Sequence, residues 1–230
     1  MGDDGKDVTP PFGHYQTEIY TRGVLQGLRP TVTTDPNKLR LQAKEAMRED
    51  AYNYIAGGAG EGATMDANRL AFRQWKIVPR MMRPSAPRDL RVSLFGELYG
   101  TWHRPWNAGR NPTDGDNDRT DASKKDSPVL IAPVGAQEVY HRDKEIGTAA
   151  ACAELNVPFV MSTASTSSMQ EVAAASGDHP RWFQLYWPMD DEITASILST
   201  AKASGFKVLV VTVDTATMSW RPADLDTACE

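Results

Sequence analysis

The chain has 230 residues, of which 40% are hydrophobic and 24% charged, the composition of a globular protein that can bury a sizeable core. Its 25 basic and 30 acidic residues are interspersed and give a net charge of −5, so no basic stripe is present for a nucleic acid. Cys152 and Cys229 lie too far apart for a metal motif or a disulfide framework. We predict no metal site, no nucleic-acid partner and a reducing compartment.

The sequence also carries no signal for a membrane. No apolar run approaches the roughly 20 residues that span a bilayer, and residues 1–7 are acidic rather than basic and then apolar. We therefore expect no membrane partner and a cytoplasmic location.

The amino-terminal part predicts an arm followed by helices. Residues 1–36 are rich in Gly, Pro, Thr and Asp, which favours an extended arm that lies on something larger. We place the main domain at 37–230. Its apolar residues follow a helical spacing from Asn37 to Ile55, after the start signal Asp35-Pro36 and before a glycine-rich end. A second helix is expected over 65–72, then strand and turn through residue 98.

Residues 102–127 form a polar insert. After two tryptophans the segment is almost entirely Asn, Asp, Thr, Gly, Ser and Lys. Such a composition cannot bury enough apolar surface to offset the entropy of ordering. We predict a disordered surface loop.

Short apolar runs alternate with helical stretches in the rest of the chain. The runs are nearly continuous, which is typical of strands buried on both faces in a parallel sheet. The alternation predicts β/α units with right-handed crossovers. The runs cover 129–133, 158–161, 182–186 and 208–213, and the helices expected between them cover 143–155, 168–175 and 191–203.

Two α/β folds compete for this pattern. A doubly wound nucleotide-binding sheet would carry a glycine-rich phosphate loop after its first strand, and residues 132–136, Ala-Pro-Val-Gly-Ala, do not provide one. Polar residues instead gather where the strands end, which is the active-site end of a TIM barrel. We therefore predict the first four β/α units of a TIM (β/α)8 barrel, preceded by an N-terminal helical arm. These polar residues are Ser162, Thr163, Gln184, Tyr186, Thr212 and Asp214.

Five blocks of sequence follow one another along the chain: 52–59 (YNYIAGGA), 132–133 (AP), 183–186 (FQLY), 212–215 (TVDT) and 220–224 (WRPAD). They resemble the FMN-dependent α-hydroxy-acid dehydrogenases and oxidases, which include glycolate oxidase and lactate oxidase, and with residues 18–20 they look closest to the lactate monooxygenase branch. The resemblance implies bound FMN, a homo-oligomer, and oxidation of a small L-2-hydroxy acid such as lactate to the 2-oxo acid or its decarboxylated product.

The same resemblance implies roles for individual residues. One segment would lie along the flavin ring, three side chains would hydrogen-bond its polar edge and tune its electron demand, and three would bind substrate. An arginine offers a planar fork to a carboxylate. The segment is Pro133, Val134 and Gly135, the polar side chains are Ser162, Gln184 and Thr212, and the substrate-side residues are Tyr54, Tyr186 and Arg221.

Each of these residues also has a structural interpretation. Gln184 and Tyr186 could satisfy buried polar groups, Tyr54 could be a packing aromatic, and Arg221 an exposed charge. Asp214 after Thr212 is better explained as a cap than as a chemical group. Polar residues occur at equivalent ends of consecutive strands, and this coincidence favours a binding site over the structural interpretation.

The resemblance implies a histidine base from a later strand, and no histidine here matches it. We therefore assign no catalytic residue and expect a truncated, inactive form. The alternatives are a non-catalytic half-barrel binding or assembly module, and a small open-sheet domain unrelated to flavin. Ala164 stands where glycolate oxidase-like members carry a tryptophan on the substrate side. A half barrel would also leave open strand edges. The four histidines are His14, His103, His141 and His179.

Overall fold

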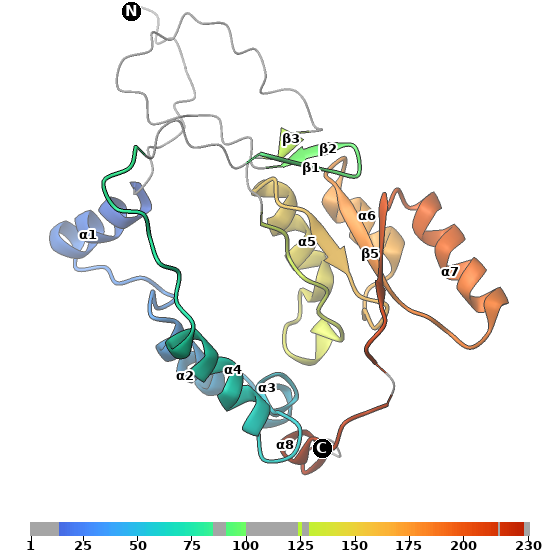
Figure 1. Ribbon diagram of the computed structural model, residues 1–230, viewed down its shortest axis with the longest axis horizontal. Helices are drawn as coiled ribbons and strands as arrows, with labels where there is room; N and C mark the ends of the chain where they lie inside the picture. Colours follow the sequence, from blue (N-terminus) through green and yellow to red (C-terminus); the bar gives the residue numbers. More distant parts are fainter. Residues whose placement is uncertain (1–13, 85–90, 100–123, 126–128, 216, 228–230) are drawn as a thin grey trace, which may run out of the picture.

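The computed structural model describes residues 14–84, 91–99, 124–125, 129–215 and 217–227. The amino-terminal part is helical, and the predicted 1–36 arm contains the first of these helices. Figure 1 shows this part as a chain of helices beside the β/α part. Its helices are α1 (His14–Gln26), α2 (Pro36–Ala46), α3 (Glu49–Ala56) and α4 (Ala63–Gln74).

The single helix predicted from Asn37 to Ile55 is wrong, because the chain breaks between α2 and α3. Helix α2 begins as expected, with the Asp35 side chain accepting the Asn37 N–H. Met47 and Arg48 then take up extended backbone conformations. The Arg48 side chain hydrogen-bonds Asp50 in the first turn of α3, and acidic groups there favour a new helix start.

A β-hairpin follows the helices and packs on the main sheet. Strands β1 (Val92–Leu94) and β2 (Glu97–Tyr99) are antiparallel, which confirms the expected strand and turn. Tyr99 meets Trp182 edge to face, with ring centroids 6.2 Å apart. Strand β3 (Lys124–Lys125) pairs with β2; it is the only part of the 102–127 insert that the structure describes, and the remaining disorder prediction lies outside the described residues.

The main sheet is parallel, as predicted. Its strand order is β4-β5-β6, with α6 and α7 as the crossovers and α5 before β4 (Figure 1). Asp190 caps α7 by accepting the Glu192 N–H. The strands are β4 (Phe159–Met161), β5 (Arg181–Tyr186) and β6 (Val208–Thr212), and the helices are α5 (Lys144–Glu154), α6 (Met169–Ser176) and α7 (Asp191–Ala203).

The core lies on both sides of β4 and β5. Because side chains alternate along a strand, Phe159 and Phe183 face the helices, whereas Val160 and Trp182 face the hairpin. Burying each such side chain stabilises the fold by about 1.5–3 kcal/mol. The helix-side cluster comprises Ala149, Cys152, Phe159, Met161, Val172, Phe183, Leu185, Ala201 and Phe206.

Two of the predicted strands are less buried than expected. The run 129–133 forms only an isolated bridge, with Ile131 paired to Phe159. In β6, Leu209 is 43% exposed and Val211 38% exposed. The prediction that both faces of the strand are buried is therefore wrong for 129–133 and for β6. Within the described residues, the 129–133 run pairs only with β4 and β6 pairs only with β5, which leaves the open edges expected of a half barrel.

The last helix returns to the amino-terminal part. Helix α8 (Pro222–Leu225) lies beside α3 (Figure 1). Asn53 Nδ2 donates to Thr227 Oγ1 at 3.4 Å, and the Gly60 N–H donates to the Trp220 carbonyl at 2.9 Å. Among the described residues, no helix combines the length and apolarity that a membrane span requires.

Candidate functional site

A row of hydrogen-bonded side chains runs across the carboxyl ends of β4, β5 and β6. Gln184 is 1% exposed. Its Oε1 accepts the Ser162 hydroxyl at 3.3 Å, and its Nε2 donates to Thr212 Oγ1 at 2.8 Å. Three residues predicted from separate strand ends therefore meet in one polar row.

Thr163 fixes the orientation of this row. Its N–H donates to Gln184 Oε1 at 3.1 Å, and its hydroxyl donates to the Gln184 carbonyl at 2.5 Å. The same hydroxyl accepts the Tyr186 N–H at 3.0 Å. With two donors on Oε1, the Gln184 amide has one favourable orientation, with its nitrogen toward Thr212.

The segment Pro133–Gly135 lies against the loop that follows β4. The Ala136 N–H donates to the Ala164 carbonyl at 2.8 Å. A Cβ on Gly135 would lie 3.0 Å from the Ala164 Cβ and 3.4 Å from Ser162 Oγ. A side chain at position 135 would therefore crowd Ala164 and Ser162, and Pro133 and Val134 beside it are exposed.

Tyr54 and Arg221 come together from α3 and the start of α8. The Arg221 guanidinium donates to the Tyr54 carbonyl and lies 5.2 Å from the centroid of the Tyr54 ring. Arg221 Nη1 also lies 3.7 Å from Asp224 Oδ2. Both residues are half-buried, so Arg221 is a fixed cation rather than the freely exposed charge of the structural interpretation.

Tyr140 contacts the Gly135 segment and was not predicted. Its hydroxyl donates to the Gly135 carbonyl at 3.5 Å. Burial, with contributions from Glu145 and Tyr54, raises the pKa of Tyr140 to about 12. The phenol therefore stays protonated near neutral pH. An aromatic residue in the loop after the first strand was the signal available in the sequence.

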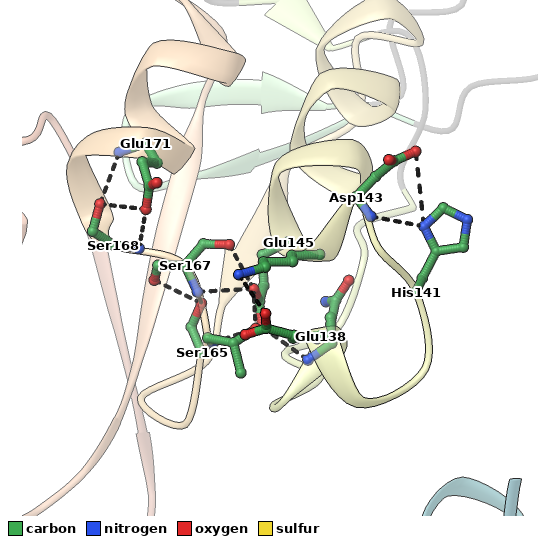
Figure 2. Close-up of polar contacts among 11 residues, drawn as sticks. Glu138, His141, Asp143, Glu145, Ser165, Ser167, Ser168 and Glu171 are labelled. Carbon is green, nitrogen blue, oxygen red and sulfur yellow. Dashed lines mark hydrogen bonds and ion pairs between the residues drawn. The ribbon is translucent and has the colours of Figure 1, made fainter. Parts of the chain in front are cut away.

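Tyr186, a predicted substrate-side residue, and His141, a histidine to which no role was assigned, lie outside the Ser162–Gln184–Thr212 row. Tyr186 ends β5 and is 43% exposed, so its ring is accessible at the strand end. His141 accepts the Asp143 N–H through Nδ1 at 3.1 Å, as Figure 2 shows. It belongs to the turn before α5.

Glu145 is the main residue that sequence reasoning missed. It is fully buried, and its carboxylate accepts N–H bonds from Gln137, Thr166 and Ser167 at 3.0–3.1 Å. Burial raises the pKa of this carboxyl, but hydrogen bonds from Thr166, Ser167 and Gln137 outweigh burial and lower the pKa to about 2. In the sequence it resembled any acidic residue in the first turn of a helix.

Fold and site together define a class of protein. Parallel β/α units with buried polar side chains at their carboxyl ends form the ligand-binding end of an α/β enzyme. The row offers uncharged donors and acceptors beside an exposed backbone segment. Such a surface suits a flat heteroaromatic group with a hydrogen-bonding edge.

Comparison with known proteins identifies the family. The family model described as FMN-dependent dehydrogenase matches residues 43–101 and 122–230. The chain therefore belongs to the FMN-dependent α-hydroxy-acid dehydrogenase and oxidase family. The two matched segments leave out 102–121, which lie within the polar insert.

Relatives and solved structures agree with this assignment. The chain is 49% identical to the FMN-dependent alpha-hydroxy acid dehydrogenase qulF of Penicillium citrinum over 94% of this chain and 48% of that protein. It is 33% identical to an L-lactate oxidase of Lysinibacillus sphaericus over 76% of this chain and 38% of that protein. A putative lactate oxidase of Pediococcus acidilactici superimposes with a TM-score of 0.68 at 29% identity, over 86% of this chain and 48% of that one. A mandelate oxidase superimposes with a TM-score of 0.67 at 26% identity, over 84% of this chain and 48% of that one.

These comparisons confirm the predicted fold class. The chain spans about half the length of the relatives that it matches. The described parallel units correspond to part of the barrel of lactate and mandelate oxidases.

Proposed function

We propose that this chain carries flavin-binding and substrate-binding residues of an enzyme that oxidises a small L-2-hydroxy acid, such as lactate, to the 2-oxo acid or its decarboxylated product. FMN, when bound, supplies the acceptor for the two electrons of that oxidation. The observation that carries the proposal is the Ser162–Gln184–Thr212 row beside Gly135 in a chain of this family.

The polar row fits the uncharged edge of a flavin ring. Gln184 Nε2 carries two hydrogens, and among the described residues it donates one of them to Thr212 Oγ1. We assign the second hydrogen to a carbonyl oxygen or ring nitrogen of the flavin. Ser162 and Thr212 place hydroxyls on either side, and the backbone of Pro133–Gly135 would lie along the ring.

The substrate carboxylate would be bound from the α3–α8 side. Arg221 carries five N–H donors in a planar fork, and its stacking on Tyr54 holds that fork in place. Tyr186 provides an exposed hydroxyl at the end of β5. We assign the proton-accepting base to none of the histidines, and we propose that the 230-residue chain alone does not turn over.

A flavin titration tests the proposal. Purified chain should quench FMN fluorescence saturably, and Gln184→Ala should weaken the affinity about tenfold, because the amide bonds are lost. The matched control is Gln170→Ala on the exposed surface of α6, which should bind as the parent chain does. Absence of quenching by the parent chain, or equal affinity for both variants, contradicts the proposed flavin site.

Substrate binding and turnover are tested on the same complex. L-lactate should perturb the visible spectrum of bound FMN more than D-lactate does, since Arg221 would fix the carboxylate and Tyr186 the hydroxyl, and the two enantiomers would then present different groups to the flavin. Tyr186→Phe should weaken that perturbation without lowering the melting temperature, whereas Tyr20→Phe, exposed on α1, should change neither. Anaerobic bleaching of the flavin by L-lactate would show that the chain is active and that our expectation of an inactive form is wrong.

A further inference from the structure

We propose that Glu145 is a positioning residue for the flavin site, whose carboxylate holds the backbone at 133–137 and the loop at 162–168 in one fixed arrangement. The flavin part rests on the proposed function. The coupling of the two segments rests on contacts within the chain.

The carboxylate connects segments more than 20 residues apart. Oε1 accepts the Gln137 N–H at 3.1 Å and the Thr166 N–H at 3.0 Å. Oε2 accepts the Ser167 N–H at 3.0 Å and the Ser167 hydroxyl at 2.8 Å, and the Thr166 hydroxyl donates to it at 2.9 Å. Figure 2 shows Glu145 at the start of α5, pointing toward the loop that bears Ser165 and Ser167. Hydrogen bonds to a charged acceptor are about twice as strong as neutral ones.

A strained residue lies directly between the carboxylate and the flavin-facing backbone. Ala136 has φ 51° and ψ 42°, a left-handed conformation that non-glycine residues rarely adopt. Such a conformation persists only when its surroundings hold it. The Ala136 N–H donates to the Ala164 carbonyl, and the next N–H, of Gln137, donates to Glu145.

The Gln137 side chain completes the arrangement. Its Nε2 donates to the Val134 carbonyl at 3.2 Å, and its Oε1 accepts the Thr148 hydroxyl at 2.7 Å. Gln137 is buried. Val134, predicted to lie along the flavin, is therefore tied through Gln137 to α5, the helix that carries Glu145.

The same loop carries the polar row. Ser162 and Thr163 immediately precede Ala164 and make the bonds to Gln184, and the Ala164 N–H donates to Ser162 Oγ at 3.1 Å. Fixing residues 166–167 from one side and Ala136 from the other therefore fixes the spacing between Pro133–Gly135 and Gln184. A flavin ring that contacts both needs that spacing.

The decisive variant is Glu145→Gln, which keeps the size of the side chain and removes its charge and one acceptor oxygen. Its control is Glu154→Gln, an exposed glutamate at the other end of α5. Three quantities are measured for each protein: amide hydrogen exchange without FMN, FMN affinity by fluorescence quenching, and the visible spectrum of bound FMN. Exchange in α7, away from Glu145, reports whether the fold persists.

Without FMN, Glu145→Gln should speed exchange in 133–137 and 162–168 about tenfold while α7 is unchanged, because amides that faced a carboxylate now face a weaker acceptor. FMN affinity should fall about tenfold and the flavin spectrum should shift. Glu154→Gln should match the parent chain. Unchanged exchange overturns the coupling, and changed exchange with unchanged affinity and spectrum overturns the positioning role.

Two further outcomes separate this inference from the proposed function. If the parent chain does not bind FMN, the proposed function and the flavin role fail, but hydrogen exchange still decides whether Glu145 couples the segments. If Glu145→Gln unfolds, Thr166→Val replaces it, since this variant removes the hydroxyl that bonds Glu145 and the Glu138 N–H but keeps the N–H bonds of Thr166 and Ser167 to the carboxylate. It should give a smaller change in the same direction, and an affinity equal to that of the parent chain would overturn the positioning role.

Discussion

The side-chain amide of Gln184 donates to the hydroxyl of Thr212 at 2.8 Å, and so joins β5 to β6 at the strand ends. Gln184 is hydrogen-bonded through side chains on both sides, to Ser162 after β4 and to Thr212 in β6. The buried amide is satisfied within the protein, as the structural interpretation of its role required. A flavin contact of its second donor hydrogen is part of the proposed function, and the Gln184–Thr212 bond can be tested by itself.

Thr212→Val should destabilise the chain by about 1–3 kcal/mol, because Gln184 Nε2 loses a buried acceptor while the side chain keeps its shape. The measurement is the free energy of unfolding from urea denaturation. Thr200→Val is the control: that hydroxyl bonds the Ser196 carbonyl within α7, and the change there should stay within about 0.5 kcal/mol. Equal losses for the two variants would contradict the special role of the Gln184–Thr212 bond.

Acid should weaken the chain through Glu145. Its pKa is lowered from 4.5 to about 2 in the folded state, so its stabilisation is complete above about pH 5 and is lost as the pH falls toward 2. The full contribution at neutral pH is about 3 kcal/mol. The check is the free energy of unfolding between pH 6 and 2 for the parent chain and Glu145→Gln.

The difference between those two proteins isolates Glu145 from other carboxyls. Glu171 also has a lowered pKa, caused by hydrogen bonds from Ser168, and both proteins retain it. The stability difference should shrink as the pH falls. A difference that is constant with pH would mean that charge at Glu145 does not contribute.

The sequence predicted the β/α order because the local signals agreed with the tertiary fold. Helix α7 begins at Asp191, with Asp190 as its cap, and the apolar run at Phe159 is buried as expected. Burial of Leu209 could not be predicted from its own run, since it depends on which segments pair beyond β6. The apolar pattern of a run predicts a strand, but the exposure of that strand depends on the segments that pack against it.

The site was predictable to a similar extent. Ser162, Gln184 and Thr212 could be found because parallel strands bring their carboxyl ends to one edge. Glu145 and Tyr140 could not, because their roles depend on loop backbone atoms that no periodicity specifies. The polar insert at 102–127 was visible from composition, and the family match leaves out most of it.

Arg221→Lys should weaken binding of a 2-hydroxy acid about tenfold or more, because an ammonium cannot form the two-pronged contact of a guanidinium. The stacking on Tyr54 should also weaken. The measurement is the concentration of L-lactate that half-perturbs the spectrum of bound FMN. Arg142→Lys, largely exposed before α5, is the control, and an unchanged lactate concentration for Arg221→Lys would contradict the role.

Gly135→Ala should destabilise the chain by about 1–3 kcal/mol, since the new Cβ would lie 3.0 Å from the Ala164 Cβ and 3.2 Å from the Ala164 carbonyl oxygen. Removing the opposing methyl tests this cause directly. Ala164→Gly alone should cost up to about 1 kcal/mol. The double variant should lose less unfolding free energy than the sum of the losses of the two single variants.

That double-variant cycle reports a coupling energy between positions 135 and 164, expected to be about 0.5–3 kcal/mol. The measurement is urea denaturation of the four proteins, with FMN affinity determined in parallel. If Gly135 is needed for chain packing alone, the double variant should regain FMN affinity along with stability. If the flavin also lies against residue 135, affinity should stay low after stability returns, because the added methyl still stands where the ring would approach.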